Sequence, residues 1–367
     1  MISACAILAV YNEADIIREA VSKLIDHGID VYLIDDASTD STIDQVQDLV
    51  GRGIVDVENV QFLEDGREVF NLSAQLKLKE QISYRLGYDW YLHVDADEIR
   101  YSPWPDLSLR EGLDRVDKAG YNLVNFKIFN FRLTHNTTFN DCFESSMLLY
   151  SEAERFQLRH VKAWKAHPTV DIACLGGHQI MVPDARIFPT RFILKHYPVR
   201  SLEHGRRKIL AERKNRFSSA ERQRGWHVQY DHLKEIDPKD VFWESDQLEA
   251  FDLERECLSL LTESNNVLCE TMREITKTFQ MLDESSFSKY WSQRLQNEGI
   301  EFGRVLQLFG VVNGLLKQLS EPQDLPPIKS NPEDALILQM ILGSLARMRF
   351  LSGDPLIYSR LQHLRFC

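Results

Sequence analysis

The sequence predicts an α/β fold in which helices cover a largely parallel β-sheet, followed by a C-terminal helical region. Short apolar segments alternate with segments of helical periodicity through the first hundred residues, which is the pattern of repeated strand-helix units. Acidic residues follow two of the apolar segments, at 35–36 and at 95–98. From about residue 236 the apolar residues recur at helical spacing. We therefore expect one region over 1–235, divided near residue 100, and a helical region over 236–367.

The first hundred residues are predicted to form four strands separated by three helices. The strands are expected at 4–10, 31–34, 60–63 and 90–94. The first helix begins near Ala14, and Gly28 ends it, because glycine adopts the positive φ that closes many helices. Ser41 or Thr42 caps the second helix, and Ser73 begins the third. The acidic residues then lie at the carboxyl edge of the sheet, where open α/β sheets bind ligands.

The rest of the chain has a different pattern. Further strands are expected at 123–133, 146–150, 171–175 and 191–197. Helices are expected at 247–261, 267–281, 287–297, 305–319 and 335–349. Asn331 and Pro332 mark the start of the last helix, since asparagine caps helices and proline fits the first turn. Basic residues dominate 204–226, and a local anion site and a solvated helix face explain this run equally well.

The composition disfavours several classes of protein. The 367 residues carry 43 Lys and Arg against 55 Asp and Glu, a formal net charge of −12, so nucleic acid is not an expected partner. The 6 cysteines are scattered without the paired spacing of a zinc site, which fits reduced thiols in the cytoplasm. No apolar run approaches the roughly 20 residues that span a bilayer. We expect a soluble cytoplasmic protein, and peripheral contact with the inner face of the membrane stays open.

The loop after the first strand disfavours two nucleotide-binding classes. Tyr11-Asn12-Glu13 stands where dinucleotide-binding folds carry Gly-x-Gly-x-x-Gly. The phosphate-binding pattern Gly-x-x-x-x-Gly-Lys-Ser/Thr does not occur in the chain. A dinucleotide oxidoreductase and a P-loop phosphotransferase are therefore disfavoured.

Asp95 and Asp97 are the first candidates for a functional site. They follow the predicted strand at 90–94, and residues two apart in a strand share one face, so both carboxylates can point at one spot. Mg²⁺ or Mn²⁺, which prefer oxygen ligands, would relieve the repulsion between them and bridge to phosphate oxygens. A solvated turn or a helix cap explains the same spacing.

Three strand-end motifs, taken together, resemble those of family 2 glycosyltransferases with the GT-A fold. They are Ala-Val-Tyr-Asn-Glu-Ala after the first strand, Leu-Ile-Asp-Asp-Ala-Ser-Thr-Asp-Ser-Thr after the second, and His-Val-Asp-Ala-Asp-Glu after the fourth. The resemblance is firm from residue 4 to about 100, looser to about 230, and absent from the C-terminal helices. It implies a soluble enzyme of bacterial type, with a donor nucleotide half over 1–100 and an acceptor half over 101–235.

The resemblance implies that the first two motifs hold the nucleoside of an activated sugar. Tyr11 and Glu13 would flank the base and ribose. Asp35 or Asp36 would accept hydrogen bonds from the ribose or base, whose N–H and O–H groups suit carboxylates. The donor is therefore expected to be a nucleotide sugar of the UDP or GDP type. The alternative for the second motif is a turn that caps a helix.

Asp95-Ala-Asp97 resembles the DXD motif of the same family. By this resemblance Asp97 would ligate Mn²⁺ or Mg²⁺, and Asp95 would contact the ribose or the donor sugar. His196 resembles a late histidine that completes the metal or diphosphate site. Candidates for contact with the diphosphate are Arg200, Ser201 and Lys208, and also Lys77 or Lys79, because phosphate oxygens favour lysine and arginine.

The resemblance also implies an inverting reaction, in which a base deprotonates the acceptor hydroxyl while the nucleotide leaves. The Glu-Asp pair of the family's acceptor half is missing, so His178 and Asp171 are the candidates for the base. No Gln-x-x-Arg-Trp segment of processive synthases occurs, which favours single additions in polysaccharide biosynthesis. The acceptor is expected to be a glycan, a lipid-linked molecule or a protein. A nucleotidyltransferase and a non-catalytic scaffold are the alternatives from other classes.

Overall fold

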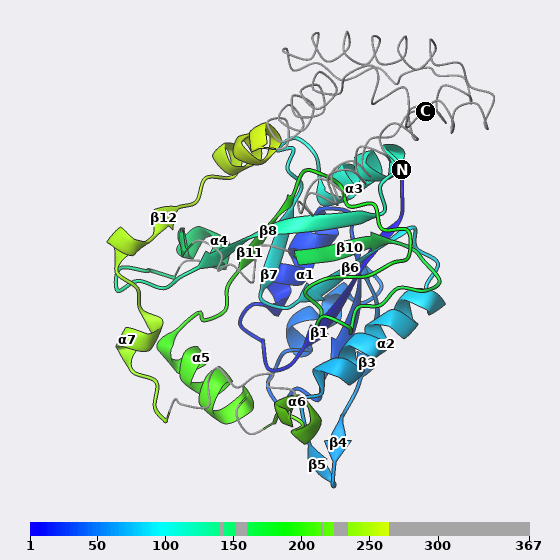
Figure 1. Cartoon of the computed structure of the whole chain (residues 1–367). Helices are drawn as coiled ribbons and strands as arrows, with labels where there is room; N and C mark the ends of the chain where they lie inside the picture. Colours follow the sequence, from blue (N-terminus) through cyan, green and yellow to red (C-terminus); the bar gives the residue numbers. More distant parts are fainter. Residues whose placement is uncertain (140–141, 152–159, 214–215, 224–233, 264–367) are drawn as a thin grey trace, which may run out of the picture. The chain divides into compact units, whose positions relative to one another are not determined.

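The computed structural model describes residues 1–139, 142–151, 160–213, 216–223 and 234–263. The chain divides into two units, Met1–Leu261 and Thr262–Cys367, and nearly all described residues belong to the first. The helices predicted at 267–281, 287–297, 305–319 and 335–349 lie outside the described residues. Figure 1 shows the fold of the first unit.

Ten strands of the described part form one sheet, and its first half is parallel. Strand β1 lies between β6 and β2, and β3 forms the edge. The bounds are Ala4–Val10 for β1, Asp30–Asp35 for β2, Ile54–Asn59 for β3 and Trp90–Asp95 for β6. The register pairs Val10 with Asp35 and Ala9 with Asp95, so the carboxyl ends of β1, β2 and β6 lie at one edge of the sheet.

The second half of the sheet is mixed. Strand β10 runs antiparallel to both β6 and β8, and β11 runs parallel to β8 and antiparallel to β7. The bounds are Glu98–Tyr101 for β7, Leu123–Phe131 for β8, Leu149–Ser151 for β9, His160–Lys165 for β10, Phe192–His196 for β11 and Glu249–Ala250 for β12. This half places the end of β11 beside the segment that follows β6.

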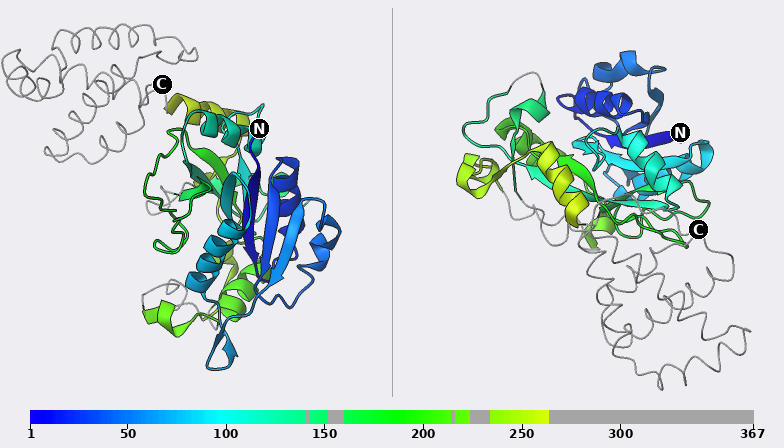
Figure 2. Two further views of the ribbon diagram at one scale, coloured as in Figure 1. Left: turned by 90° about the vertical axis from the view of Figure 1, so that its right-hand side faces the viewer. Right: turned by 90° about the horizontal axis from the view of Figure 1, so that it is seen from above.

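Strand β1 is buried on both faces, which requires cover on both sides of the sheet. Leu8 packs in one cluster with α1 (Ile17–Asp26) and α3 (Leu109–Lys118), whereas Ile7 packs with α2 (Leu72–Arg85). Figure 2 shows these helices on the two sides of the sheet. Each fully buried leucine or isoleucine side chain contributes about 1.5–3 kcal/mol, so the sheet is a firm base for the loops at its edge.

Most of the predicted strands are confirmed within two residues. These are the strands at 4–10, 31–34, 90–94, 123–133 and 191–197. The first and third predicted helices correspond to α1 and α2, whereas the second is the 3₁₀ helix η1, Asp44–Leu49. The predicted strand at 146–150 instead spans the end of α4, Phe143–Ser146, and the start of β9.

Two of the predicted strands are wrong. The strand after η1 is Ile54–Asn59 and not 60–63; only Ile54 within it is fully buried, so this edge strand has too little apolar periodicity to stand out. The segment 171–175 is a turn, held by hydrogen bonds from the N–H groups of Ala173 and Cys174 to Asp171 Oδ1. Strand β10 has no counterpart in the prediction, because its alternate side chains are polar although they are buried.

Short elements complete the first unit. They are β4 (Leu63–Glu64), β5 (Arg67–Glu68), α5 (Leu202–Arg206), the π-helical η3 (Arg207–Arg213), α6 (Ser219–Gln223), α7 (Pro238–Val241) and η5 (Ser245–Gln247). The helix predicted at 247–261 is helical over 253–263. Within the described residues, every helix is too short or too polar to cross a membrane.

Candidate active site

A cavity of 340 Å³ lies where the carboxyl ends of β1 and β6 meet η3. Seven residues singled out in the sequence line it: Tyr11, Glu13, Asp95, Asp97, His178, His196 and Lys208. Others do not line it, among them Asp35, Asp36, Lys79 and Asp171. The sheet topology thus brings together the loops that follow β1, β6 and β11, as expected for ligand binding at this edge.

The first two sequence motifs are joined by side-chain hydrogen bonds. Asn12, which has a positive φ of 52°, accepts a hydrogen bond from the backbone N–H of Thr39 at 2.8 Å. Ser38 accepts one from the N–H of Asn12, and Thr42 accepts one from the N–H of Glu13 at 2.9 Å. The Ser and Thr residues of the second motif therefore fix the loop that carries Tyr11 and Glu13 into the cavity.

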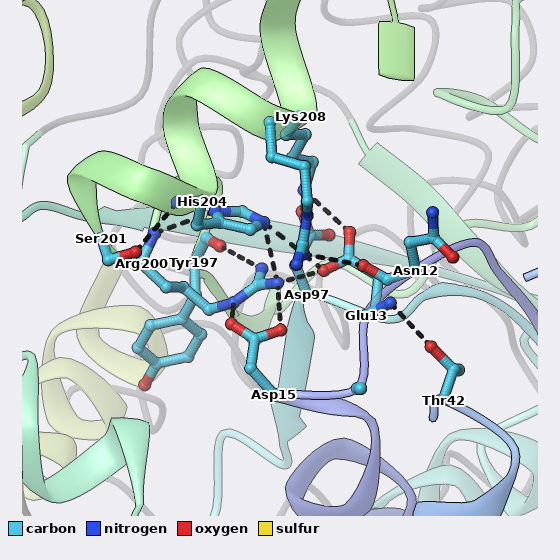
Figure 3. A network of polar contacts seen from close by, with 12 residues as sticks. Asn12, Glu13, Asp15, Thr42, Asp97, Tyr197, Arg200, Ser201, His204 and Lys208 are labelled. Atoms are coloured by element: carbon cyan, nitrogen blue, oxygen red, sulfur yellow. Dashed lines mark hydrogen bonds and ion pairs between the residues drawn. The ribbon is translucent and has the colours of Figure 1, made fainter. Parts of the chain in front are cut away.

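Asp97 lies at the centre of a buried group of charges (Figure 3). Its Oδ2 accepts a hydrogen bond from Lys208 Nζ at 2.8 Å, and the same ammonium lies 2.9 Å from Glu13 Oε1. Burial alone would raise the pKa of Asp97, but Lys208, His196 and Arg200 outweigh it and hold this pKa well below its usual range. Asp97 is therefore a carboxylate throughout the physiological pH range.

Asp97 and His196 fit a divalent metal ion as a pair. Asp97 Oδ2 lies 3.7 Å from His196 Nε2, within the roughly 3.0–4.2 Å that separates two ligands of an octahedral ion. His196 Nδ1 lies 2.9 Å from Asn130 Oδ1, an oxygen that can only accept, so Nδ1 carries a proton and Nε2 is the ring nitrogen available to a metal ion. Among the described residues, no group of three or more His, Cys, Asp or Glu side chains could hold a metal ion. Substrate phosphates and water would have to complete the coordination.

Arg200 ties this group to the loop after β1 (Figure 3). Its Nε donates to Asp15 Oδ2 at 2.7 Å, and its terminal nitrogen contacts both Asp15 Oδ1 and Glu13. His204 Nε2 lies 3.0 Å from the same terminal nitrogen. Burial acts to raise the pKa of Glu13, but Lys208 and Arg200 hold it well below its usual range. Arg200 does not line the cavity and acts as a support for Glu13.

Asp95 is neutralised by a different lysine. Lys162 Nζ of β10 donates to Asp95 Oδ2 at 2.9 Å and to Glu98 Oε1 at 2.7 Å, and Glu98 also pairs with Arg100. Burial acts to raise the pKa of Asp95, but Lys162, followed by His93, holds it well below its usual range. Each aspartate of the acidic motif therefore has its own lysine in the cavity wall.

Lys79 is fully buried beneath the cavity. Its Nζ lies 2.8 Å from His93 Nδ1 and donates to the carbonyl oxygen of Val94 at 2.9 Å. In its charged form the ammonium can only donate, so His93 Nε2 then carries the proton, 3.9 Å from Asp95 Oδ1. Burial lowers the pKa of Lys79 to about 7. Lys79 thus acts on Asp95 through His93 and has no direct contact with the cavity.

Asp36 does not line the cavity itself but contacts Arg216, which does. The Arg216 guanidinium covers the Tyr11 ring, with Cζ 3.5 Å from the ring centroid, and a terminal nitrogen lies 3.4 Å from Asp36 Oδ2. Asp36 is 1% exposed, and its Oδ1 has no hydrogen-bond partner among the described residues. Burial raises the pKa of Asp36 to about 6, although Arg216 opposes the shift. A buried acceptor without a partner suits an incoming N–H or O–H group.

His178 lines the cavity and follows a constrained glycine. Gly177 has a φ of +78°, and a Cβ atom there would stand 2.8 Å from His93 Nε2, so the backbone conformation and the close approach both require glycine. The His178 ring packs edge-on against His160, with centroids 5.0 Å apart. Partial desolvation and the nearby Lys162 lower the pKa of His178. It is therefore neutral near pH 7 and able to accept a proton.

Asp171, the other candidate base, faces its own turn. Its Oδ1 accepts hydrogen bonds from the N–H groups of Ala173 and Cys174, each at 3.0 Å, and lies 3.6 Å from Lys77. These contacts give Asp171 a structural role as a turn cap. Of the two candidate bases, His178 lines the cavity and Asp171 does not.

Lys162, His93 and Glu212 line the cavity, although the sequence did not single them out as site residues. Lys162 belongs to the strand that was not predicted. Glu212 could have been found from the sequence, because His204, Lys208 and Glu212 recur every four residues, a spacing that predicts one helical face. The basic run at 204–226 is therefore partly a cavity wall, which it forms through Lys208 and Arg216.

Residues 5–75 match the sequence model of the family described as Glycosyl transferase family 2. The match includes the first two strand-end motifs and confirms the resemblance there, and with it the predicted enzyme class, glycosyltransferase. Together with the parallel half of the sheet, the match confirms the predicted fold class, an α/β fold of GT-A type. No curated protein sequence matches the chain.

Several solved structures are similar to this chain. S. aureus TarS 1–349 in complex with UDP-GlcNAc is 13% identical, with a TM-score of 0.32 over 55% of this chain and 60% of that one. Glucosyl-3-phosphoglycerate synthase from Mycobacterium tuberculosis, in complex with Mn²⁺ and UDP-Glc, is 20% identical, with a TM-score of 0.24 over 35% and 44%. Mannosyl-3-phosphoglycerate synthase from Rubrobacter xylanophilus is 18% identical, with a TM-score of 0.26 over 36% and 41%. The chain spans less than two thirds of each of these proteins.

Proposed function

We propose that this chain is a metal-dependent glycosyltransferase that moves a sugar from a nucleotide sugar of UDP or GDP type to a glycan, lipid-linked or protein acceptor. The supporting observation is that Tyr11, Asp95, Asp97 and His196 line one cavity at the carboxyl edge of the sheet, in a chain whose residues 5–75 match the glycosyl transferase family 2 model. The cavity volume of 340 Å³ falls within the roughly 300–1,000 Å³ of small-molecule sites.

The nucleoside is assigned to the cavity wall formed by Tyr11 and Arg216, with Asp36 behind Arg216. Tyr11 and Arg216 offer a flat, stacked surface that suits an aromatic base. The unpartnered Asp36 Oδ1 would accept a hydrogen bond from an N–H of the base or an O–H of the ribose. Asp35 accepts from the N–H of Ser38 at 3.3 Å and supports the turn that presents Asp36.

The diphosphate is assigned to the Asp97 side of the cavity. Asp97 and His196 would hold Mn²⁺ or Mg²⁺, and the ion would neutralise the negative charge that develops on the departing nucleoside diphosphate. Lys208 lies in the same wall and would supply a second positive charge. Asp95, held by Lys162, would orient the ribose or the donor sugar.

The acceptor hydroxyl is assigned to the His178 side. His178 would take the proton of this hydroxyl as it attacks the sugar from the face opposite the leaving group, which inverts the anomeric centre. The lowered pKa of His178 keeps the ring neutral and ready to accept that proton. We propose single additions to the acceptor and no processive synthesis.

A nucleotide panel tests the proposed function. Full-length protein is titrated with UDP, GDP, CDP and ADP, each with and without Mn²⁺ or Mg²⁺, and thermal unfolding is followed. One nucleotide is expected to stabilise the protein in the presence of metal, by about 2.7 kcal/mol at 100 times its Kd. The matching nucleotide sugar should then lose its sugar to water or acceptor without release of pyrophosphate. Stabilisation by none of the nucleotides would refute the donor site, and pyrophosphate release would point to a nucleotidyltransferase.

Nucleotide affinity is expected to fall in acid because of Asp36. Its pKa is raised to about 6 in the free protein, so the carboxylate that accepts the nucleoside hydrogen bond is lost as the pH falls through 6. Between pH 7 and pH 5 the Kd should rise about tenfold. Isothermal titration calorimetry of wild type and Asp36→Asn measures this, because the phosphate of the nucleotide titrates equally with both proteins. Parallel pH profiles of the two proteins would contradict the role of Asp36.

The raised pKa of Asp36 also predicts a pH dependence of stability. Unlike nucleotide affinity, the free energy of unfolding should be higher in acid. Because the folded protein holds the Asp36 proton more tightly than the unfolded chain does, the free energy of unfolding that Asp36 contributes decreases as the pH rises from about 4 to about 6. Asp36→Asn should remove this component from the pH dependence of unfolding.

A further inference from the structure

Lys208 stands between the two carboxylates at the metal end of the cavity (Figure 3). Its Nζ lies 2.8 Å from Asp97 Oδ2 and 2.9 Å from Glu13 Oε1, and the lysine side chain is only 7% exposed. Asp97 and Glu13 are buried as well, so their charges need a partner. In the free protein Lys208 therefore supplies the positive charge that a metal ion would otherwise bring to Asp97.

One carboxylate oxygen faces both possible cations. Asp97 Oδ2 accepts from Lys208 and also lies 3.7 Å from His196 Nε2, the second metal-ligand candidate. An ion bound to this oxygen would stand within about 3–4 Å of the ammonium, and like charges this close in a partly buried site repel each other strongly. A metal ion bound to Asp97 would therefore weaken the ion pair between Lys208 and Asp97, and this ion pair would weaken metal binding.

A nucleoside diphosphate would offer Lys208 a different partner. Lys208 lines the same cavity as Asp97 and His196. A lysine ammonium is a mobile point charge on a flexible stem, and phosphate oxygens bind it well. When a diphosphate enters, its oxygens can replace Asp97 as the partner of the Lys208 ammonium. Asp97 Oδ2 is then available to the metal.

We propose that Lys208 is a positioning residue that makes metal binding at Asp97 depend on the donor nucleotide. Its ammonium group forms ion pairs with Asp97 and Glu13 in the free protein. When metal and nucleotide bind together, the ammonium group instead forms an ion pair with the diphosphate. The inference rests on the proposed donor site. By linkage, the nucleotide raises the affinity for metal by the same factor as the metal raises the affinity for nucleotide.

Mn²⁺ binding to the full-length protein tests this role without any measurement of activity. Wild type and Lys208→Met are titrated with Mn²⁺ alone and with Mn²⁺ plus UDP or, in parallel, GDP, and free Mn²⁺ is followed by electron paramagnetic resonance. We expect Lys208→Met to bind Mn²⁺ alone at least about tenfold more tightly than wild type. The same variant should bind the nucleotide alone less tightly, because a phosphate contact is lost. A purely structural lysine would not produce these opposite changes.

Three further variants control the experiment. Lys208→Arg keeps the positive charge and should retain the wild-type dependence on nucleotide. Lys195→Met removes a similarly buried lysine, 9% exposed and 2.6 Å from Glu144 outside the cavity, and should leave Mn²⁺ binding unchanged. Lys208→Gln replaces Lys208→Met should the latter fail to fold, with the same expected gain.

Two results would overturn the inference. One is equal affinity of wild type and the charge-removing Lys208 variants for Mn²⁺ alone. The other is a wild-type protein that binds Mn²⁺ as tightly without nucleotide as with it. Failure of every nucleotide to bind would instead refute the proposed donor site, and the comparison with Mn²⁺ alone would still decide the role of Lys208.

Discussion

Asp97→Asn is expected to lower the rate of sugar transfer by a factor on the order of 10³, the scale of loss when a group that stabilises developing charge is removed. The substitution keeps the shape of the side chain and removes its charge. The metal would lose its carboxylate ligand, and the diphosphate would depart without full neutralisation. Release of nucleoside diphosphate from the nucleotide sugar, measured under saturating Mn²⁺ or Mg²⁺, gives the rate.

Asp15→Asn is the matched control for Asp97→Asn. Asp15 belongs to the same charge network through Arg200, but its side chain is 38% exposed and does not line the cavity. The rate of Asp15→Asn should stay close to that of wild type, and thermal unfolding of both variants shows whether the fold is retained. A metal-dependent rate near wild type in Asp97→Asn would remove Asp97 from the metal site.

The parallel half of the sheet could be predicted because its strands carry their own signal. Strands β1 and β6 are buried on both faces and appear as continuous apolar segments. The edge strand β3 buries little, so its sequence resembles a loop. The polar strand β10 is recognised only through its pairing with β6 and β8, which sequence alone does not give.

Site residues could be predicted from the sequence where they follow a predicted strand, and not where they lie on a strand that was missed. Tyr11, Asp95 and Asp97 follow predicted strands, so their convergence at the sheet edge could be inferred. Lys162 reaches Asp95 because Ala163 pairs with Leu92 across an antiparallel register, which is a tertiary feature. Asp171 was a candidate by residue type alone, and its turn draws the carboxylate onto backbone N–H groups instead.

Arg200→Met is expected to lower the free energy of unfolding by about 3–5 kcal/mol, the cost of removing one partner from a buried ion pair. Arg200 is 1% exposed and contacts two carboxylates, those of Glu13 and Asp15. Methionine fills much of the space and pairs with neither carboxylate. Urea denaturation followed by intrinsic fluorescence measures the loss.

Arg18→Met removes the same type of ion pair from the surface and serves as the control. Arg18 NH1 lies 2.7 Å from Asp48 Oδ1, with side chains 51% and 57% exposed. Exposed pairs of this kind contribute about 0–1 kcal/mol, so this variant should unfold nearly as wild type does. Similar losses in the two arginine variants would mean that burial does not set the strength of the Arg200 pair.

The pH dependence of Arg200→Met separates charge from packing. Burial acts to raise the pKa of Glu13 and of Asp15, but their cationic partners outweigh it and lower both pKa values. The stability from these pairs is therefore present above about pH 4.5 and is lost as the pH falls through the lowered values. The difference between wild type and Arg200→Met should shrink in acid, and a constant difference would assign the loss to packing. Because Glu13 is shared by Arg200 and Lys208, loss of Arg200 would also tighten the hold of Glu13 on Lys208, so one carboxylate couples the stability of the fold to the charge balance at Asp97.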